Sequence, residues 1–382
     1  YLKKFKFECD VYAVPEGTPV FPNEPIITVK GPAVQAQFLE TMLLLLTNHQ
    51  SLIATKASRI CRAAAGRPVF EFGTRRAQGT NAAVMGARAA YIGGCMGTAC
   101  AICESLYGIP AVGTMAHSWV QMYDSELEAF EEYARLYPDN CTLLIDTYNV
   151  LKSGLPNAIK TYEEVLRPMG KRLAGVRIDS GDVAYLTKKT RKILDDAGLT
   201  DCKIFVSNSL DEYIIRDILS QGAVIDFFRV GERLITSKSE PVLGGVYKLV
   251  AAENDKGELI PKIKLSENVE KITTPGYKEV YRLYSNTTGK MVADLIALKD
   301  ETFDFTKTIT LFHPQFTWKK KTFENYPAVK LLRPIYLKGK KVYTSPDIKE
   351  IKSYCNEQIG KLWDELIRFE NPEEYYVDLS QK

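Results

Sequence analysis

His117 is the residue whose type and position point most clearly to chemistry. The 382 residues contain only three histidines, and this one follows Gly113-Thr114, where a predicted strand ends. A histidine there can act as a base, as a substrate contact or as a nucleophile that takes up phosphate. His49 lies in a long predicted helix and is interpreted as structural, and His313 has no functional cluster around it. We therefore take His117 as the catalytic candidate.

Arginines and carboxylates also follow the predicted strands. Arg75, Arg76 and Arg177 can grip a carboxylate or a phosphate, because a guanidinium makes paired charge-assisted hydrogen bonds to either. Arg75 and Arg76 are adjacent and cannot easily point the same way, so one of them is expected to be structural. Three carboxylates suit a magnesium-bound polyphosphate or sugar hydroxyls: Asp146, Asp179 and Asp182. A strand-end aspartate can equally be a helix cap.

Small residues complete the strand ends. Backbone NH groups near helix starts bind anions well, and four positions offer them: Gly181, Ser207, Asn208 and Gly231. Ser207 could instead cap the helix that starts near Asp211. The late strands are also where barrel phosphate sites usually lie. Six polar strand ends that share one mouth predict an enzyme site for a phosphorylated substrate, because helix capping alone does not require so many.

The elements that must position these side chains repeat between residues 69 and 236. Short β-branched or aromatic runs alternate with helical patterns such as Ser125–Tyr137, Gly154–Leu166 and Asp182–Ala197. This alternation indicates βαβ units and favours a parallel β/α barrel over an open doubly wound sheet. A doubly wound sheet would usually carry a glycine-rich dinucleotide turn after its first strand, and the sequence has none there. The predicted strands are Val69–Phe72, Ala90–Ile92, Ala111–Thr114, Thr142–Ile145, Gly175–Ile178, Lys203–Val206 and Ile225–Val230.

The flanks differ from this repeat and predict a second, discontinuous domain. We expect residues 1–58 to form part of an α/β sandwich, 59–236 to form the catalytic barrel, and 237–382 to complete the sandwich. Gln35–Ser58 is predicted as one helix and Ser345–Arg368 as another. The expected flanking strands are Cys9–Val14, Pro25–Val29, Val246–Ala251, Leu259–Leu265, Val280–Tyr284 and Met291–Ala297.

Composition excludes several classes of function. A net charge of +3 is too balanced to argue for a nucleic-acid or membrane partner, and no apolar run approaches the roughly 18 residues of a membrane helix. Cys100-Ala-Ile-Cys103 has no second cysteine or histidine pair at zinc spacing, so it is interpreted as core packing. Eight cysteines in mostly apolar surroundings fit a reducing cytoplasm. The chain starts at Tyr1 without Met, and we expect it to lack an N-terminal segment.

Several ordered motifs resemble nicotinate phosphoribosyltransferases of the bacterial kind. The resemblance runs nearly end to end and includes the closing Leu362-Trp-Asp-Glu-Leu. The other matching segments are Glu71-Phe-Gly-Thr-Arg-Arg-Ala-Gln-Gly79, Gly113-Thr-Met-Ala-His-Ser118, Leu144-Ile-Asp-Thr-Tyr148, Gly175-Val-Arg-Ile-Asp-Ser-Gly-Asp182, Gly231-Glu-Arg-Leu-Ile-Thr236 and Gly244-Gly-Val-Tyr-Lys-Leu249.

The resemblance implies condensation of nicotinate with 5-phosphoribosyl 1-pyrophosphate to nicotinate mononucleotide and pyrophosphate, a step of NAD biosynthesis. ATP hydrolysis is coupled through a phosphohistidine, which falls on His117. The nicotinate contacts fall on Thr114 and Arg177, and the phosphoribosyl pyrophosphate site falls on Glu232 or Thr236. Arg75, Arg76, Asp146, Asp179, Ser180, Gly181, Ser207, Asn208 and Gly231 complete the expected substrate site, with magnesium held through pyrophosphate by Asp146 and Asp179.

The resemblance also implies an irregular phosphoribosyltransferase-type β/α barrel beside an α/β sandwich, in a cytoplasmic homodimer with shared active sites. Members carry an additional N-terminal segment whose tyrosine stacks on the nicotinate ring. One enzyme alternative is nicotinamide phosphoribosyltransferase, in which the segment before the histidine typically carries an acidic residue. Here Met115-Ala116 stands at that place. A second enzyme alternative is quinolinate phosphoribosyltransferase, which lacks the phosphohistidine motif. A third alternative is a catalytically inactive binding protein.

Overall fold

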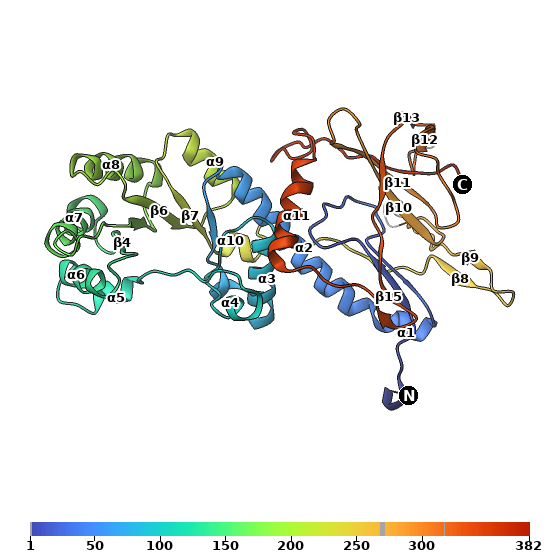
Figure 1. The fold of residues 1–382 in the computed structure, drawn as a ribbon, viewed down its shortest axis with the longest axis horizontal. Helices are drawn as coiled ribbons and strands as arrows, with labels where there is room; N and C mark the ends of the chain where they lie inside the picture. Colours follow the sequence, from blue (N-terminus) through green and yellow to red (C-terminus); the bar gives the residue numbers. More distant parts are fainter. Residues whose placement is uncertain (1, 268–271, 317) are drawn as a thin grey trace. The chain divides into compact units, whose positions relative to one another are not determined.

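The computed structural model describes residues 2–267, 272–316 and 318–382, which fall into two compact units (Figure 1). The central unit comprises residues 49–243, and the flanking unit combines residues 1–48 with 244–382. The boundary falls inside helix α2 (Glu40–Ala63), which contributes residues to both units. Every described β-sheet lies wholly within one unit.

The central unit is built on a five-stranded parallel sheet with the order β3-β7-β6-β5-β4. Two isolated parallel bridges, Glu71 to Thr98 and Thr98 to Ala111, continue the sheet beyond β3. Among the described residues no ladder joins Ala111 back to β4, so the sheet curls without closing through backbone pairs. The strands are β3 (Val69–Glu71), β4 (Thr142–Leu144), β5 (Gly175–Ile178), β6 (Lys203–Asn208) and β7 (Phe227–Val230).

Helices connect these strands, and α6, α7 and α8 lie beside them in Figure 1. All three residues of β4 and three of the four in β7 are buried, as expected for parallel strands covered on both faces. The connecting elements are η2 (Thr74–Arg76), α3 (Thr80–Ile92), α4 (Ile102–Tyr107), α5 (His117–Gln121), α6 (Glu126–Leu136), the π-helical η3 (Val150–Gly154), α7 (Leu155–Thr161), the π-helical η4 (Tyr162–Leu166), α8 (Val183–Asp196), α9 (Glu212–Ser220) and α10 (Glu232–Ile235).

Side-chain caps fix where the helices after β5 and β6 begin. The Asp182 carboxylate accepts a hydrogen bond from the backbone NH of Tyr185 at the start of α8. Asp211 accepts from the NH groups of Tyr213 and Ile214 at the start of α9. The capping interpretation of Asp182 is therefore confirmed, whereas Ser207 does not cap α9, because Asp211 occupies that position.

Two strand predictions in the central unit are wrong. Ala90–Ile92 belongs to helix α3, whose alanine-rich sequence favours a helix over a strand. The sheet position beyond β3 is filled instead by Thr98 through its bridges. Ala111–Thr114 is not a strand but contributes one bridge at Ala111. The other five predicted strands are present with shifts of up to two residues.

The flanking unit contains a four-stranded sheet, a six-stranded sheet and a hairpin, with the orders β16-β15-β1-β2, β13-β12-β17-β11-β10-β14 and β8-β9. Pairing is antiparallel except between β11 and β17. The strands are β1 (Asp10–Ala13), β2 (Ile27–Lys30), β8 (Ala251–Glu253), β9 (Leu259–Pro261), β10 (Lys278–Tyr284), β11 (Met291–Leu298), β12 (Thr308–Phe312), β13 (Lys320–Glu324), β14 (Ala328–Lys330), β15 (Arg333–Leu337), β16 (Lys340–Lys341) and β17 (Val377–Leu379).

Helices accompany these sheets at both ends of the sequence: η1 (Leu2–Lys4), α1 (Ala33–Phe38), the first part of α2, and α11 (Ile348–Gly360). The predicted helix Gln35–Ser58 is divided between α1 and α2 at Leu39, and α11 ends eight residues before the predicted Arg368. Val246–Ala251 is largely not a strand, because β8 begins only at Ala251. No helix in the described part of the chain is long and apolar enough to cross a membrane.

Candidate active site at the strand ends

The carboxyl ends of the central strands bring the predicted residues together. His117 begins helix α5, Arg177 lies within β5, and Ser207 lies near the end of β6. Asp146 and Asp179 follow β4 and β5. Because neighbouring parallel strands end on the same side of a sheet, these side chains converge at one edge.

His117 sits between two carboxylates and a hydroxyl group. Its Nδ1 atom lies 3.1 Å from Oγ1 of Thr147, and its Nε2 atom lies 3.7 Å from Oδ2 of Asp179 and 4.0 Å from Oδ1 of Asp146. The histidine side chain is 40% exposed, whereas that of Asp146 is 2% exposed. Nε2 is therefore the ring nitrogen that faces the carboxylates, while Thr147 fixes the orientation of the ring.

Each carboxylate beside His117 has one oxygen engaged and one available. Asp146 Oδ2 accepts hydrogen bonds from the Asp179 backbone NH, at 3.0 Å, and from the Ser180 hydroxyl, at 2.6 Å. Oδ1 of Asp146 is buried and accepts no hydrogen bond from the described residues. Asp179 uses Oδ1 for Arg177 and Ser207 and directs Oδ2 towards His117.

Arg177, Asp179 and Ser207 form one polar network. Arg177 Nε donates to Ser207 Oγ at 2.8 Å, and its Nη2 donates to Asp179 Oδ1 at 3.0 Å. Burial alone would raise the pKa of Asp179, but the hydrogen bond from Ser207 and the charge of Arg177 outweigh it and hold that pKa below its usual value. Asp179 is therefore ionised at neutral pH and fixes the guanidinium of Arg177.

Arg229, in β7, was not among the predicted site residues, yet it joins this cluster. It is 5% exposed and donates from Nη1 to Thr114 Oγ1 at 2.8 Å, while Arg177 Nη1 approaches the same oxygen at 3.3 Å. Its Nε is buried without a hydrogen-bond acceptor, and no described carboxylate lies within 4.0 Å of it. Burial, followed by repulsion from Arg177, lowers the pKa of Arg229 to about 10, so it remains charged at neutral pH.

Two aromatic rings enclose Arg229. Its guanidinium carbon lies 5.0 Å from the ring centroid of Phe72 and 4.8 Å from that of Phe205. Phe205 stacks on Phe227 with a centroid distance of 4.6 Å. Cation–π attraction offsets part of the cost of burying the charge. The sequence signal for Arg229 is a single arginine within the otherwise apolar run Phe227-Phe-Arg-Val230.

A cavity of about 450 Å³ lies between the loops that follow β5 and β6. Its lining includes Gly181, Asn208 and Arg233. Gly181 has a φ of +85°, which favours glycine because other residues rarely adopt this backbone conformation. Arg233 pairs with Asp211, and Asn208 Oδ1 accepts the backbone NH of Ser209. The cavity thus joins two of the predicted anion-binding positions.

Other predicted residues are not joined to the His117 cluster by a described contact. Arg75 and Arg76 form the exposed segment η2, and within the described chain neither makes an ion pair. Gly231 precedes α10, and Thr236 donates its hydroxyl to the backbone oxygen of Glu232 at 2.8 Å, while Glu232 pairs with Lys238.

Within the described residues, no group of three or more histidine, cysteine or acidic side chains is arranged to hold a metal ion. Cys100 and Cys103 are free and buried, as the packing interpretation predicted. His49 is partly buried in α2, and His313 Nδ1 accepts the backbone NH groups of Gln315 and Phe316 within a turn. Only His117 among the three histidines lies beside the strand-end carboxylates.

Comparison with known proteins gives the same family over most of the chain. The nicotinate phosphoribosyltransferase (NAPRTase) family description matches residues 68–227. Its N-terminal domain description matches residues 1–48, and its C-terminal domain description matches residues 277–382.

Individual relatives agree. Nicotinate phosphoribosyltransferase of Bacillus subtilis is 46% identical over 97% of this chain and 75% of its own length. The human protein is 30% identical over 98% of this chain and 78% of its own length. The crystal structure of human nicotinic acid phosphoribosyltransferase superposes with a TM-score of 0.85, at 28% identity, over 98% of this chain and 81% of that chain.

A structure of nicotinate-nucleotide pyrophosphorylase from Pyrococcus furiosus matches with a TM-score of 0.71, at 28% identity, over 93% of this chain and 82% of that chain. These likenesses confirm the predicted α/β phosphoribosyltransferase fold. The chain belongs to the nicotinate phosphoribosyltransferase family of enzymes.

Proposed function

We propose that this chain transfers the 5-phosphoribosyl group of phosphoribosyl pyrophosphate to nicotinate, giving nicotinate mononucleotide and pyrophosphate for NAD biosynthesis. One observation carries the proposal beyond family membership. Arg177 and Arg229 meet at the Thr114 hydroxyl, and Arg229 is a buried cation without a described carboxylate partner. An unpaired buried charge is costly, so the site is built to receive an anion.

The surroundings of the two arginines favour an aromatic carboxylate. Phe72 and Phe205 place aromatic surface beside the Arg229 guanidinium, where a flat ring can pack. A carboxylate oxygen can accept charge-assisted hydrogen bonds from both arginines, whereas a neutral amide offers one oxygen and two donors. This difference favours nicotinate over nicotinamide.

The transfer itself forms one bond and breaks one. The pyridine nitrogen bonds to the anomeric carbon of the ribose, and the bond from that carbon to pyrophosphate breaks, so pyrophosphate leaves with the electron pair. Because no protein group needs to form a covalent bond here, catalysis consists of positioning and charge stabilisation. We assign the phosphorylated end of the substrate to the loops that line the cavity, with Gly181 and Asn208, and to Glu232 or Thr236 of α10.

The donor set beside His117 fits a magnesium ion. Asp146 Oδ1 is a buried, unsatisfied carboxylate oxygen, and Asp179 Oδ2 is not engaged by Arg177 or Ser207. Magnesium is commonly held by one or two carboxylates together with substrate phosphates, which agrees with a site of fewer than three protein ligands. Bound there with pyrophosphate, the ion would neutralise charge on the leaving group.

We assign ATP coupling to His117. When Nδ1–H donates to Thr147, Nε2 carries the lone pair needed for attack. Nε2 then bonds to the terminal phosphorus of ATP, the bond to the bridging oxygen breaks, and ADP leaves. While phosphorylated, His117 carries a dianion at the strand ends, which would reorganise the neighbouring loops and favour product formation. Water later cleaves the bond between nitrogen and phosphorus and releases phosphate.

A paired substrate assay tests the proposal. The purified chain is incubated with phosphoribosyl pyrophosphate, magnesium and ATP, and with either nicotinate or nicotinamide. We expect nicotinate mononucleotide and pyrophosphate in equal amounts, and at least about tenfold lower kcat/KM for nicotinamide, which corresponds to about 1.4 kcal/mol. Equal turnover of both substrates would contradict the carboxylate assignment. Binding of phosphoribosyl pyrophosphate without turnover of either would favour an inactive binding protein.

We also propose a cytoplasmic homodimer. All eight cysteines are free, which suits a reducing compartment. Met42 and Leu45 of α2 are 53% and 68% exposed, and exposed apolar side chains that cluster on one helix are typical of association surfaces. Sedimentation equilibrium gives the mass directly, and a monomer at micromolar concentration would overturn the dimer.

A further inference from the structure

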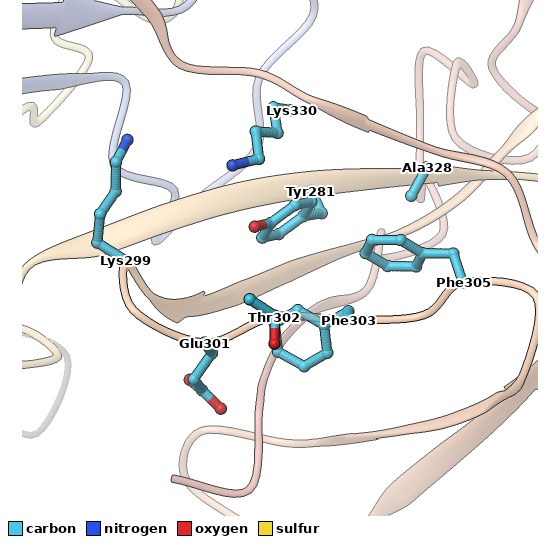
Figure 2. Close-up of a pocket in the computed structure, with 8 residues that line it drawn as sticks. All are labelled: Tyr281, Lys299, Glu301, Thr302, Phe303, Phe305, Ala328 and Lys330. Atoms are coloured by element: carbon cyan, nitrogen blue, oxygen red, sulfur yellow. The ribbon is translucent and has the colours of Figure 1, made fainter.

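The flanking unit contains a cavity that the proposed reaction does not use. It has a volume of about 430 Å³, within the size range of small-molecule sites, and it is lined by Tyr281, Lys299, Glu301, Thr302, Phe303, Phe305, Ala328 and Lys330 (Figure 2). These residues come from β10, from the end of β11 and the segment after it, and from β14. The strand-end residues of the central unit contribute nothing to this lining.

Three aromatic rings form one wall of this cavity. The ring centroid of Tyr281 lies 5.7 Å from that of Phe303 and 5.3 Å from that of Phe305, and the two phenylalanine rings are 5.9 Å apart. Tyr281 is almost fully buried, whereas Phe303 and Phe305 are only partly buried. Phe303 and Phe305 therefore offer accessible ring surface, next to the Tyr281 ring, on which a flat ligand can pack.

Two lysines supply positive charge on the other side. In Figure 2 the Lys330 amine lies beside the Tyr281 hydroxyl, Lys299 rises on the same side, and the Glu301 carboxylate points away from both. Lys299 Nζ lies 2.6 Å and Lys330 Nζ 3.8 Å from Oε2 of Glu279. The Glu279 side chain is 2% exposed, whereas those of Lys299 and Lys330 are 30% and 54% exposed. Both ammonium groups are thus more accessible than the Glu279 carboxylate with which they pair.

Both lysines keep N–H donors for a ligand, although the Lys299 ammonium also lies over the rings of Tyr12, at 4.5 Å, and Tyr277, at 5.7 Å, which do not line the cavity. An ammonium has three N–H donors, and the one described hydrogen bond from Lys299 Nζ goes to Glu279. Lys330 lies over the Tyr281 ring at 5.3 Å and makes an ion pair with Glu279 but no described hydrogen bond. Glu301 does not compete for them, because its Oε2 accepts the Leu298 backbone NH and the Ser380 hydroxyl, each at 2.8 Å.

We propose that this cavity is a binding site for a small aromatic anion, whose ring packs on Tyr281, Phe303 and Phe305 while its carboxylate or phosphate bridges Lys299 and Lys330. The inference does not depend on the proposed function. A free aromatic carboxylate and a nucleoside monophosphate share this chemistry, and separate probes distinguish them.

Calorimetric titration with benzoate and with AMP tests the site, using acetate and cyclohexanecarboxylate as ligand controls. We expect at least one of the two aromatic anions, benzoate or AMP, to bind about tenfold tighter than acetate and cyclohexanecarboxylate. Lys330→Gln should weaken that binding about tenfold, because one charged hydrogen-bond donor is lost. Lys340→Gln, a change of an exposed lysine in the same unit, should leave it unchanged.

Stoichiometry separates this site from the strand-end arginines, which could also bind an aromatic carboxylate. If both sites bind, the wild-type chain takes two benzoate molecules, and in Lys330→Gln one of the two sites keeps its affinity while the other binds about tenfold more weakly. If the proposed function is wrong, Lys330→Gln still weakens the one site that remains. Binding that is identical in the wild type and Lys330→Gln, or no tighter for benzoate and AMP than for the controls, would overturn the inference.

Discussion

The guanidinium of Arg229, within β7, donates a hydrogen bond of 2.8 Å to the hydroxyl oxygen of Thr114, which follows the bridge residue Ala111. Arg177 reaches the same oxygen, and its charge is offset by Asp179. Arg229 has no such carboxylate, and it is only 5% exposed to solvent. The site therefore holds one surplus positive charge where we propose that the ring carboxylate of nicotinate binds.

Replacement of Arg229 by leucine should reduce activity without reducing stability. Loss of a charged hydrogen bond removes about 1.5–3 kcal/mol of binding, which is roughly 10- to 100-fold in kcat/KM for nicotinate. The melting temperature should stay constant or rise, because the change relieves an unpaired buried charge. Turnover of nicotinamide should change little, so the ratio of the two kcat/KM values is the measurement.

Two variants control this experiment. Arg229→Lys keeps the charge but not the planar fork, and should retain part of the preference for nicotinate. Arg135→Gln alters an exposed arginine of α6 and should leave both substrates unaffected. An equal loss of activity towards nicotinate and nicotinamide in Arg229→Leu would assign Arg229 a structural role instead.

Asp179 should stabilise the protein at neutral pH but not in strong acid. Its pKa is held below the ordinary value of about 3.9 in the folded state, so the folded protein releases this proton more readily than the unfolded chain. The contribution is present above about pH 4 and is lost as the pH falls through the lowered pKa. Asp179→Asn should cost roughly 1–3 kcal/mol near pH 7. The free energy of unfolding of Asp179→Asn and of the wild type is measured from pH 7 to pH 3. A difference between the two that stays constant over this range would refute the prediction.

Glu24 should destabilise the flanking unit as the pH rises. It is buried beside Arg282 and Asp294, so two carboxylates share one guanidinium. Burial, and then hydrogen bonding and repulsion involving Asp294, raise its pKa to about 10, and the folded state retains a proton that the unfolded chain loses near pH 4.3. Stability from this group is full below about pH 4.3 and falls as the pH rises from there through the raised pKa of the folded state.

Glu24→Gln should remove this dependence, because glutamine remains neutral at every pH. Unfolding at pH 6 and pH 9 should show a smaller decline in the variant than in the wild type. Glu374→Gln, at an exposed glutamate, is the matched control and should decline as the wild type does. Parallel decline of Glu24→Gln and the wild type would mean that Glu24 is already ionised in the folded protein.

The sequence predicted the central strands because buried parallel strands are short apolar runs that end in polar residues. The same pattern predicted that Asp146, Asp179 and Ser207 lie at the site. The prediction for His117 used the strand Ala111–Thr114, which the structure reduces to a single bridge at Ala111. Arg229 was not predicted, although it has the same next-to-last place in β7 that Arg177 has in β5. Its importance depends on what surrounds it, because Phe72 comes from another strand end and Arg177 has the largest charge effect on its pKa.

The flanking sheets were predicted only in part, and the reasons are also physical. β13 alternates exposed and half-buried residues and contains three lysines or glutamates, so it lacks an apolar run. β1 pairs with β15 across more than three hundred residues, with Val11 opposite Tyr336, and no local pattern reveals such a pairing. Asp294 lies opposite Arg282 in the β10–β11 register, which explains how a guanidinium can be buried in the middle of a predicted strand.

Replacement of His117 by alanine should abolish stimulation by ATP. Nε2 is the proposed phosphate acceptor, and alanine offers no nucleophile, so the rate with ATP should equal the rate without it. Basal transfer to nicotinate should persist, because Arg177, Arg229 and the loops around the cavity are unchanged. His313→Asn is the matched control, since asparagine can still accept the backbone NH groups that His313 accepts. Full ATP stimulation of His117→Ala would exclude the assigned role.

The most direct measurement follows the phosphate itself. The chain is incubated with magnesium and ATP radiolabelled at the terminal phosphate, and peptides are mapped under basic conditions that preserve phosphohistidine. We predict acid-labile label on His117, loss of that label in His117→Ala, and its release as phosphate when nicotinate and phosphoribosyl pyrophosphate are added. Stable label on another residue, or nicotinate mononucleotide formed with ATP stimulation and no label on His117, would contradict this account.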